Sequence, residues 1–229
     1  MISRERILEA LSGVRDPELD ESITSLGFVE GVEAEGGSVH VQLRLPTYWC
    51  AANFAYIMAA DAKTALLSLP EVSHARVNLI DHFSSTEINR GMALDNNFQE
   101  TFEGLADGEL GEVRDLFARK AFVSRQEKLC RVLKSRGHTP ETLAGLRLDD
   151  LPAGDETEAY LSRRKDLGLD LSGTAPFLID PSGRRIRAEE APDHLRFARL
   201  MATSIEANGS MCRALLANRY GIIDEEAML

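Results

Sequence analysis

Two kinds of hydrophobic pattern follow one another along the first 90 residues. Apolar residues recur at helical spacing between Ser3, a good N-cap residue, and Gly13, a common helix stop. Apolar and polar residues then alternate over residues 39–45, which is typical of a half-buried strand. The Ala-rich stretch over residues 51–68 returns to helical spacing and ends before Pro70. The start of the chain is therefore predicted to mix helices and strands.

The order of these elements predicts a fold. Strands are expected over residues 28–34, 39–45 and 75–80, and the turn-rich residues 35–38 join the first two in a hairpin. A helix between the second and third strands suits a right-handed crossover, which would make these two strands parallel. We therefore predict an α/β (α+β) domain of two layers over residues 1–90, with the order helix–strand–strand–helix–strand.

Beyond residue 90 the pattern becomes mostly helical. Residues 96–108 are weakly patterned and are expected to form a linker or surface loop. Helices are expected over residues 109–136, 155–167, 192–207 and 210–220, with a small hairpin over residues 175–186. The last two helices are separated in this prediction by the Asn-Gly-Ser sequence at residues 208–210. Residues 91–229 are thus predicted to form a mostly helical region with one hairpin.

Composition and charge narrow the possible functions. The 229 residues are 44% hydrophobic and 28% charged, as in ordinary globular proteins. Their net charge of -11 argues against nucleic-acid and anionic-membrane partners, and no apolar run is long enough to span a bilayer. The three cysteines lie far apart without a CxxC pair, which argues against a disulfide framework or a self-contained zinc site. We therefore expect a cytoplasmic protein.

Cys50 is the first candidate for chemistry, because it falls between the second strand and the helix that follows. Unpaired N–H groups and the positive dipole end of a helix N-terminus stabilise a thiolate, which can bind a soft metal or act as a nucleophile. The alternative is a cysteine that only packs, as buried free cysteines usually do. Cys130 and Cys212 lie within helical patterns and are expected to be packing residues.

His82 is the second candidate, because it follows the third strand. Parallel neighbouring strands end at the same edge of a sheet, where open α/β sheets usually bind ligands. Cys50 and His82 are therefore expected to approach one another and, with a carboxylate, to form a possible iron or zinc site. Alternatively, Asp81 and Ser84 cap a turn and His82 is a solvated loop residue.

Several motifs together resemble a known family. Asp16-Pro17-Glu18 is followed by SITSLGFV at residues 22–29, by the predicted hairpin, and by Thr47 shortly before Cys50. Over about residues 4–82 this arrangement is similar to the iron–sulfur cluster assembly domain family. The resemblance implies a small α/β domain, often dimeric, in which one reactive cysteine helps to load iron–sulfur or related metal centres onto client proteins. It implies that Cys50 is this thiol and that Asp16, Glu18 and Thr47 shape the pocket around it.

These observations predict an accessory or maturation factor and not an enzyme. An iron ion or iron–sulfur cluster would pass transiently through Cys50, because clusters usually need about four ligands and one thiol cannot store them. A second subunit, a small thiol or the client would supply the other ligands, and the helical region would recognise the client. Extended proteins of this kind resemble those that accompany bacterial multicomponent di-iron monooxygenases, which suggests such a client. The alternatives are an enzyme with Cys50 as nucleophile and His82 as base, or a pure interaction module.

Overall fold

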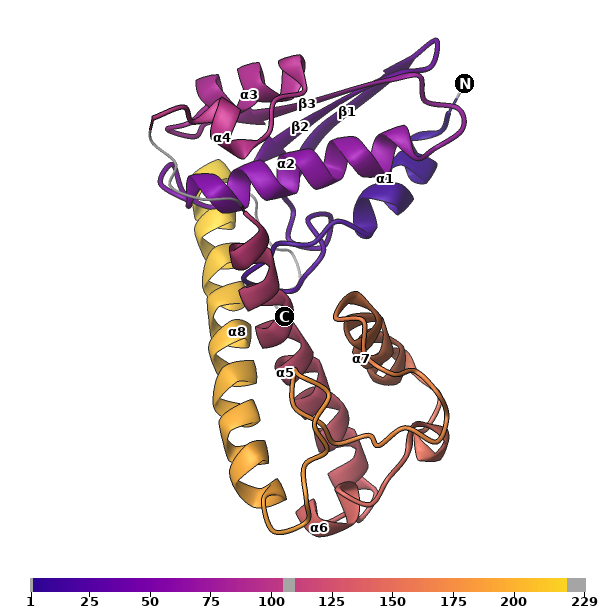
Figure 1. Ribbon diagram of the computed structural model, residues 1–229. Coiled ribbons are helices and arrows are strands. Elements are labelled where there is room, and N and C mark those ends of the chain that lie inside the picture. The colour runs from indigo at the N-terminus through magenta and orange to yellow at the C-terminus, as the bar shows by residue number, and fades with distance from the viewer. Residues whose placement is uncertain (1, 105–109, 222–229) are drawn as a thin grey trace. The chain divides into compact units, whose positions relative to one another are not determined.

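The computed structural model describes residues 2–104 and 110–221, and these divide into two compact units (Figure 1). Unit 1 comprises Met1–Glu112 and Asn208–Leu229, and unit 2 comprises Val113–Ala207. The domain boundary predicted after residue 90 falls inside the helix α3 (Ser85–Leu94), which belongs to unit 1. Among the described residues, no helix is both long enough and apolar enough to cross a membrane.

Unit 1 contains a three-stranded sheet with the order β1-β2-β3. The strands are β1 (Val29–Glu35), β2 (Ser38–Arg44) and β3 (His74–Ile80). β1 and β2 form an antiparallel hairpin, whose turn has two glycines with positive φ, Gly36 and Gly37. β2 and β3 are parallel, as predicted, with Val41 opposite Val77. The predicted strands and their directions are therefore confirmed.

Two helices cover one face of this sheet and make it a two-layer α+β domain. They are α1 (Arg4–Ser12), whose first turn is capped by the Ser3 hydroxyl, and α2 (Ala52–Leu67), which forms the crossover between β2 and β3 (Figure 1). The alternating residues Val39, Val41 and Leu43 of β2 are buried beneath these helices. The predicted fold class is thus confirmed, because the period of two along β2 places its apolar side chains on one face.

Residues 81–104 are more regular than the sequence predicts. The polar stretch after β3 leads into α3, and the expected linker contains the short helix α4 (Phe98–Thr101). The side chain of Asn89 in α3 makes the two hydrogen bonds that a neighbouring strand would make with Leu79. The N–H of Leu79 donates to Oδ1 of Asn89 (2.7 Å), and Nδ2 of Asn89 donates to the carbonyl of Leu79 (2.9 Å). Asn89 therefore satisfies backbone groups at the edge of β3 that would otherwise be open to another strand.

Unit 2 has its own hydrophobic core around Phe122, Tyr160 and Phe177. Its helical elements are α5 (Gly111–Ser135), which begins in unit 1, α6 (Pro140–Leu143), η1 (Leu148–Asp150), α7 (Asp155–Asp166) and the first part of α8 (Ala191–Tyr220). The buried guanidinium of Arg164 donates to the Tyr160 hydroxyl (2.9 Å), which in turn donates to the carbonyl of Phe177 (2.7 Å). The core of unit 2 is thus fixed by a buried polar chain as well as by packing.

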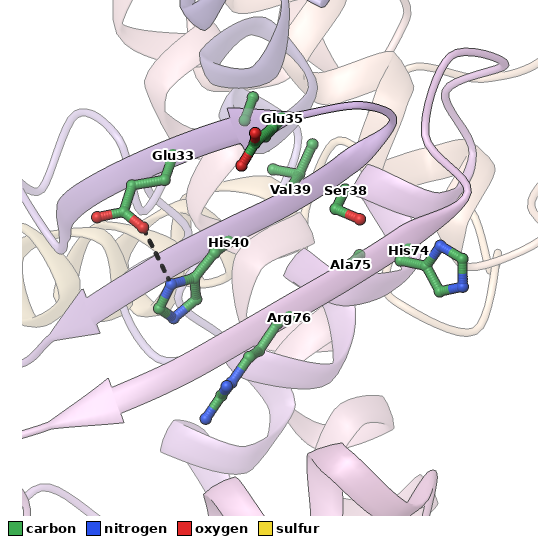
Figure 2. A pocket seen from close by; sticks show the side chains of 9 residues that line it. Glu33, Glu35, Ser38, Val39, His40, His74, Ala75 and Arg76 are labelled. Atoms are coloured by element: carbon green, nitrogen blue, oxygen red, sulfur yellow. Dashed lines mark ion pairs between the residues drawn. The ribbon is translucent and has the colours of Figure 1, made fainter.

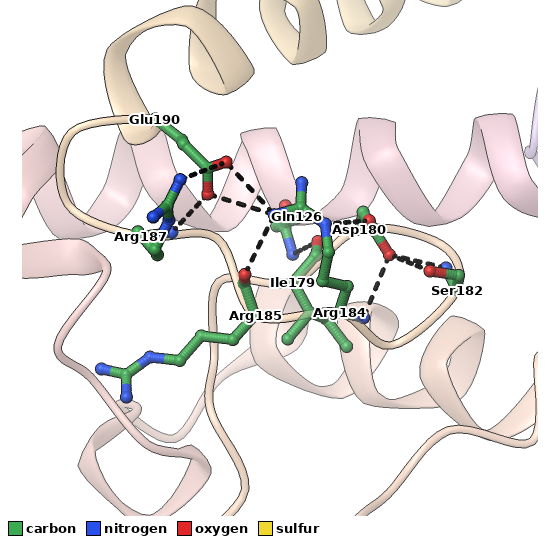
Figure 3. A network of polar contacts seen from close by, with 8 residues as sticks. All are labelled: Gln126, Ile179, Asp180, Ser182, Arg184, Arg185, Arg187 and Glu190. Atoms are coloured by element: carbon green, nitrogen blue, oxygen red, sulfur yellow. Dashed lines mark hydrogen bonds and ion pairs between the residues drawn. The ribbon is translucent and has the colours of Figure 1, made fainter.

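A polar network in unit 2 occupies the place of the predicted hairpin (Figure 3). Within residues 175–186, an isolated β-bridge joins Ile179 to Arg185, and two regular strands are not formed. The carboxylate of Asp180 accepts the backbone N–H of Ser182 (2.9 Å) and the Nε of Arg184 (3.1 Å). Side-chain hydrogen bonds within the turn therefore replace a strand ladder.

The last two predicted helices are one continuous helix, α8, so the predicted break at residues 208–210 is wrong. Glycine inside a helix costs only about 1 kcal/mol relative to alanine, which packing can outweigh. At Gly209 a Cβ atom would lie 2.8 Å from Oε1 of Glu21, so the missing side chain lets the helix approach residues of unit 1.

The substitution Asn89→Ala tests the edge role of this side chain. It removes both partners of Leu79, and we expect the free energy of unfolding to fall by about 1–3 kcal/mol in urea denaturation. Asn78→Ala is the matched control, because Asn78 directly precedes Leu79 on β3 and, among the described residues, its side chain accepts a hydrogen bond from the exposed Arg76. Equal effects of the two substitutions would contradict the assignment.

Candidate functional site

The candidate site is built from two loops at the carboxyl ends of β2 and β3, residues 45–51 and 81–84. Parallel pairing brings these loops to the same edge of the sheet. Two hydrogen bonds join them: the N–H of Phe83 donates to the carbonyl of Tyr48 (3.1 Å), and Nε2 of His82 contacts the carbonyl of Cys50 (2.7 Å). The two sequence-predicted residues Cys50 and His82 are therefore brought together, through the backbone of Cys50.

The thiol of Cys50 is half-buried and lies within hydrogen-bonding distance of Thr47. The Oγ1 of Thr47 lies 3.3 Å from its Sγ atom. Cys50 directly precedes Ala51, the N-cap of α2, which provides no side-chain cap to the helix. The thiol thus lies at the strand–helix junction that the sequence predicts, held by Thr47 within the same loop.

His82 is buried, and both of its ring nitrogens are occupied by the backbone. The N–H of Ser84 donates to Nδ1 (3.2 Å), which leaves the ring proton on Nε2 to be donated to the carbonyl of Cys50. Burial lowers the pKa of His82, the charge of Arg219 lowers it further, and the bond to Cys50 opposes both effects. The neutral imidazole therefore holds the two loops together by hydrogen bonds.

An exposed aromatic cluster lies beside Cys50, formed by Tyr48, Trp49 and Phe83. The rings of Trp49 and Phe83 stack with centroids 5.7 Å apart, and those of Tyr48 and Trp49 meet edge to face at 4.9 Å. Trp49 is 75% exposed. Apolar side chains gathered in an exposed patch are more typical of binding surfaces than single exposed ones are.

The turn that begins at Asp16 contributes two carboxylates. The Oδ1 of Asp16 accepts the backbone N–H groups of Glu18 (2.9 Å) and Leu19 (2.8 Å), which fixes the turn. Asp16 is buried, and this burial raises its pKa to about 6 against the opposing effect of these two bonds. The Oε1 of Glu18 accepts from the side-chain amide of Asn208 in α8 (3.4 Å).

The end of α8 binds both loops of the site, which the sequence does not predict. The guanidinium of Arg219 donates to the carbonyl of Leu45 (3.1 Å) and to that of Asp81 (2.6 Å). Leu216, one turn earlier, is buried in the core of unit 1. Arg219 therefore fastens the carboxyl ends of β2 and β3 to one another, and sequence reasoning gave this residue no role.

Cys212 also belongs to this neighbourhood and was expected only to pack. It is half-buried against the same core as Cys50. Burial, together with the charges of nearby acidic groups and against the opposing charge of Arg213, raises its pKa to about 11. The spacing of 208, 212, 216 and 219 places four contacting residues on one helix face. This spacing is visible in the sequence and indicates a shared helix face, but the helix break predicted at residues 208–210 obscured it.

The structure supplies few metal ligands at this place. Among residues 2–104 and 110–221, no three His, Cys, Asp or Glu side chains are grouped so that they could hold a metal ion. The described residues thus do not fit a resident cluster with four protein ligands.

A surface pocket lies at the other end of the strands, away from Cys50. Glu33, His40, His74 and Arg76 are among the residues that line it, near the beginnings of β2 and β3 (Figure 2). His40 Nδ1 and Glu33 Oε2 are 3.6 Å apart. No cysteine lines this pocket, so it does not share the chemistry of the Cys50 site.

The two-layer α+β domain thus carries the thiol of Cys50 at the junction between β2 and α2. The chain belongs to the iron–sulfur cluster assembly protein family, whose pattern matches residues 4–79. The resemblance found in the sequence is thereby confirmed.

Two relatives are similar to this part of the chain. Over 78 residues the chain is 37% identical to the Fe-S protein maturation auxiliary factor YitW of Bacillus subtilis, a match covering 34% of this chain and 74% of the relative. Over 90 residues it is 33% identical to an uncharacterized protein of Methanocaldococcus jannaschii, covering 39% and 93% respectively.

The raised pKa of Asp16 predicts a pH-dependent stability effect. The folded chain loses this proton near pH 6 and the unfolded chain near 3.8, so the contribution of Asp16 to stability is lost as pH rises through this window. Asp16→Asn keeps the acceptor oxygen without the charge. We expect it to raise the free energy of unfolding at pH 7.5 by up to about 3 kcal/mol and to have little effect near pH 4. An effect that does not change with pH would contradict this.

The three thiols are expected to differ in reactivity. Burial raises the pKa of Cys130 to about 12 and that of Cys212 to about 11, and only the thiolate is nucleophilic. With iodoacetamide at pH 8, peptide mass spectrometry should find Cys50 alkylated first, Cys212 more slowly, and Cys130 only after denaturation. Alkylation of Cys130 in the native protein as fast as Cys50 would contradict the described burial.

Proposed function

We propose that this protein is an auxiliary factor in the maturation of iron–sulfur proteins, which receives iron or an iron–sulfur cluster at Cys50 and passes it to a client protein. The observation that carries the proposal is the half-buried thiol of Cys50 in the loop after β2, within a domain of the iron–sulfur cluster assembly family. A relative named as a maturation auxiliary factor supports the same role. The protein acts by delivery and not by catalysis.

The ligand set favours transfer over storage. Iron–sulfur clusters are usually held by about four ligands. Among the described residues, no three His, Cys, Asp or Glu side chains are grouped so that they could hold a metal ion. The client or a second copy of the chain completes the coordination, which makes departure of the cargo easy. This supports a homodimer or a transient complex with the client, in the cytoplasm, where thiols stay reduced.

The aromatic cluster gives the client a place to bind. Tyr48, Trp49 and Phe83 are 45%, 75% and 43% exposed, although large apolar side chains are usually buried. Aromatic residues, Trp and Tyr above all, are enriched at the energetic centres of protein interfaces. The client would therefore dock directly beside Cys50. Multicomponent di-iron monooxygenases are one class of client that the sequence resemblance suggests.

The geometry disfavours a cysteine-nucleophile enzyme. Such an enzyme needs a base on the thiol, and the ring nitrogens of His82 are both engaged by the backbone. The neighbour of the thiol is the hydroxyl of Thr47. We therefore assign His82 the role of a positioning residue that holds the carbonyl of Cys50, and not that of a base or metal ligand.

Client maturation with Cys50→Ser tests the proposal. An apo [4Fe–4S] enzyme is supplied anaerobically with ferrous iron and limiting sulfide, and the recovery of its activity is followed with and without this protein. Wild type should accelerate recovery, and Cys50→Ser should give only the rate seen without added protein, because serine cannot replace a soft thiolate ligand.

Cys130→Ser is the matched control, since it removes a thiol buried in unit 2. It should accelerate recovery as wild type does, and circular dichroism should show all three proteins folded. Acceleration by Cys50→Ser equal to that of wild type would refute the role of Cys50 and favour a pure interaction module.

A further inference from the structure

The last turn of α8 holds the two loops of the Cys50 site at the points where they leave the sheet. One terminal nitrogen of the Arg219 guanidinium donates to the carbonyl of Leu45 (3.1 Å), and the other donates to that of Asp81 (2.6 Å). Leu45 directly follows β2, and Asp81 directly follows β3. A guanidinium presents its donors in a fixed planar fork, so these two bonds set the strand ends relative to one another.

Asp81 has a backbone conformation that such a bond supports. Its φ of 52° lies in the left-handed region, which residues other than glycine rarely occupy. Conformations of this kind persist where the surrounding structure holds them, and they are common at functional sites. The next residue, His82, contacts the carbonyl of Cys50 (2.7 Å). The bond from Arg219 to Asp81 therefore holds the turn from which His82 reaches the loop of the thiol.

Arg219 is itself placed by an aromatic neighbour. Its guanidinium carbon lies 5.1 Å from the ring centroid of Tyr220, and the guanidinium carbon of Arg44 lies 4.5 Å from the same centroid. Guanidinium groups are attracted to the faces of aromatic rings. Arg44 is the last residue of β2 and forms an ion pair with Glu30 of β1. The end of α8 is thus attached to the sheet as well as to the two loops.

We propose that Arg219 is a positioning residue of the Cys50 site, which holds the loop of the thiol against the loop of His82. Beyond the strand ends, these loops are joined by the contact of His82 with Cys50 and by the bond from Phe83 to Tyr48. Both contacts require the two strand ends to keep their relative position, which the fork of Arg219 fixes. Burial lowers the pKa of His82, and the positive charge of Arg219 lowers it further, which favours the neutral ring.

This inference deepens the proposed function and rests on it for its biological meaning. A thiol that receives and passes on a cargo must keep its position relative to the client. In enzymes, a displacement of about 1 Å can lower a rate about 100-fold. Arg219 belongs to unit 1 but lies outside residues 4–79 of the family match. A residue supplied by α8 therefore completes the geometry of this site.

The fluorescence anisotropy of Trp49 tests the positioning role directly. Trp49 is the one tryptophan in the sequence, and its ring stacks on that of Phe83 in the other loop (5.7 Å between centroids). Arg219→Gln removes the fork and should loosen this stacking. The time-resolved anisotropy decay of Trp49 should then show a larger nanosecond phase than in wild type. In the client maturation assay, Arg219→Gln should accelerate recovery at least about tenfold less than wild type does.

Arg213→Gln is the matched control, because it removes a guanidinium from the same part of α8. Arg213 donates to Oε2 of Glu21 (2.6 Å), which lies outside both loops of the site. This variant should match wild type in anisotropy and in maturation. Circular dichroism and urea denaturation verify that each variant is folded. If Arg219→Gln does not fold, Arg219→Lys decides the test, since it keeps the charge without the fork and should change both readouts in the same direction.

The outcomes separate this inference from the proposed function. An anisotropy decay of the Arg219 variant equal to that of wild type, or an equal change in Arg213→Gln, overturns the positioning role. A larger nanosecond phase with unchanged acceleration of maturation overturns it as well. If wild type itself does not accelerate maturation while the Arg219 variant still loosens Trp49, the proposed function fails and the positioning of the loops stands.

Discussion

The parallel pairing of β2 with β3 is the constraint on which the site depends. It requires a crossover, which α2 provides, and it brings the loops after both strands to one edge of the sheet. Only this arrangement lets His82 reach the carbonyl of Cys50 and Phe83 reach that of Tyr48. An antiparallel β3 would place residues 81–84 at the opposite end of the sheet, far from the thiol.

The end of α8 depends on the same arrangement. Arg219 binds the carbonyls of Leu45 and Asp81, one from each strand end, so its two hydrogen bonds require both strands to end together. Guanidinium groups present several donors in a fixed plane, which suits this fork. The same helix face also contacts the turn that begins at Asp16, through the hydrogen bond from Asn208 to Glu18. Burial raises the pKa of Asp16 in this turn to about 6, so its ionised form opposes folding at neutral pH.

Much of unit 1 could be predicted from the sequence because its signals are local. The alternation of apolar residues along β2 and their helical spacing along α2 arise because each element buries one face. A helix that connects two neighbouring strands in this way makes the strands parallel, which gives the direction of β3 relative to β2. The helix α3 could not be predicted, because the bonds of Asn89 to β3 stabilise it through tertiary contact. The position of Cys50 was predicted for the same local reasons. Cys212 packs against the core of unit 1, as expected of a packing residue, but the face of α8 that it shares with Asn208 and Arg219 could not be predicted, because the continuity of this helix through Gly209 contradicts local propensity.

Loading with iron and sulfide tests the central claim, that cargo enters through the thiol of Cys50. Wild type and Cys50→Ser are incubated anaerobically with ferrous iron, sulfide and a small thiol that supplies the remaining ligands, and the absorbance of thiolate-bound iron is recorded without removing these reagents. We predict that wild type raises this absorbance above that of the protein-free mixture and that Cys50→Ser does not, although both are folded. Equal absorbance with the two proteins would contradict the account, because the cargo would then be held by other residues.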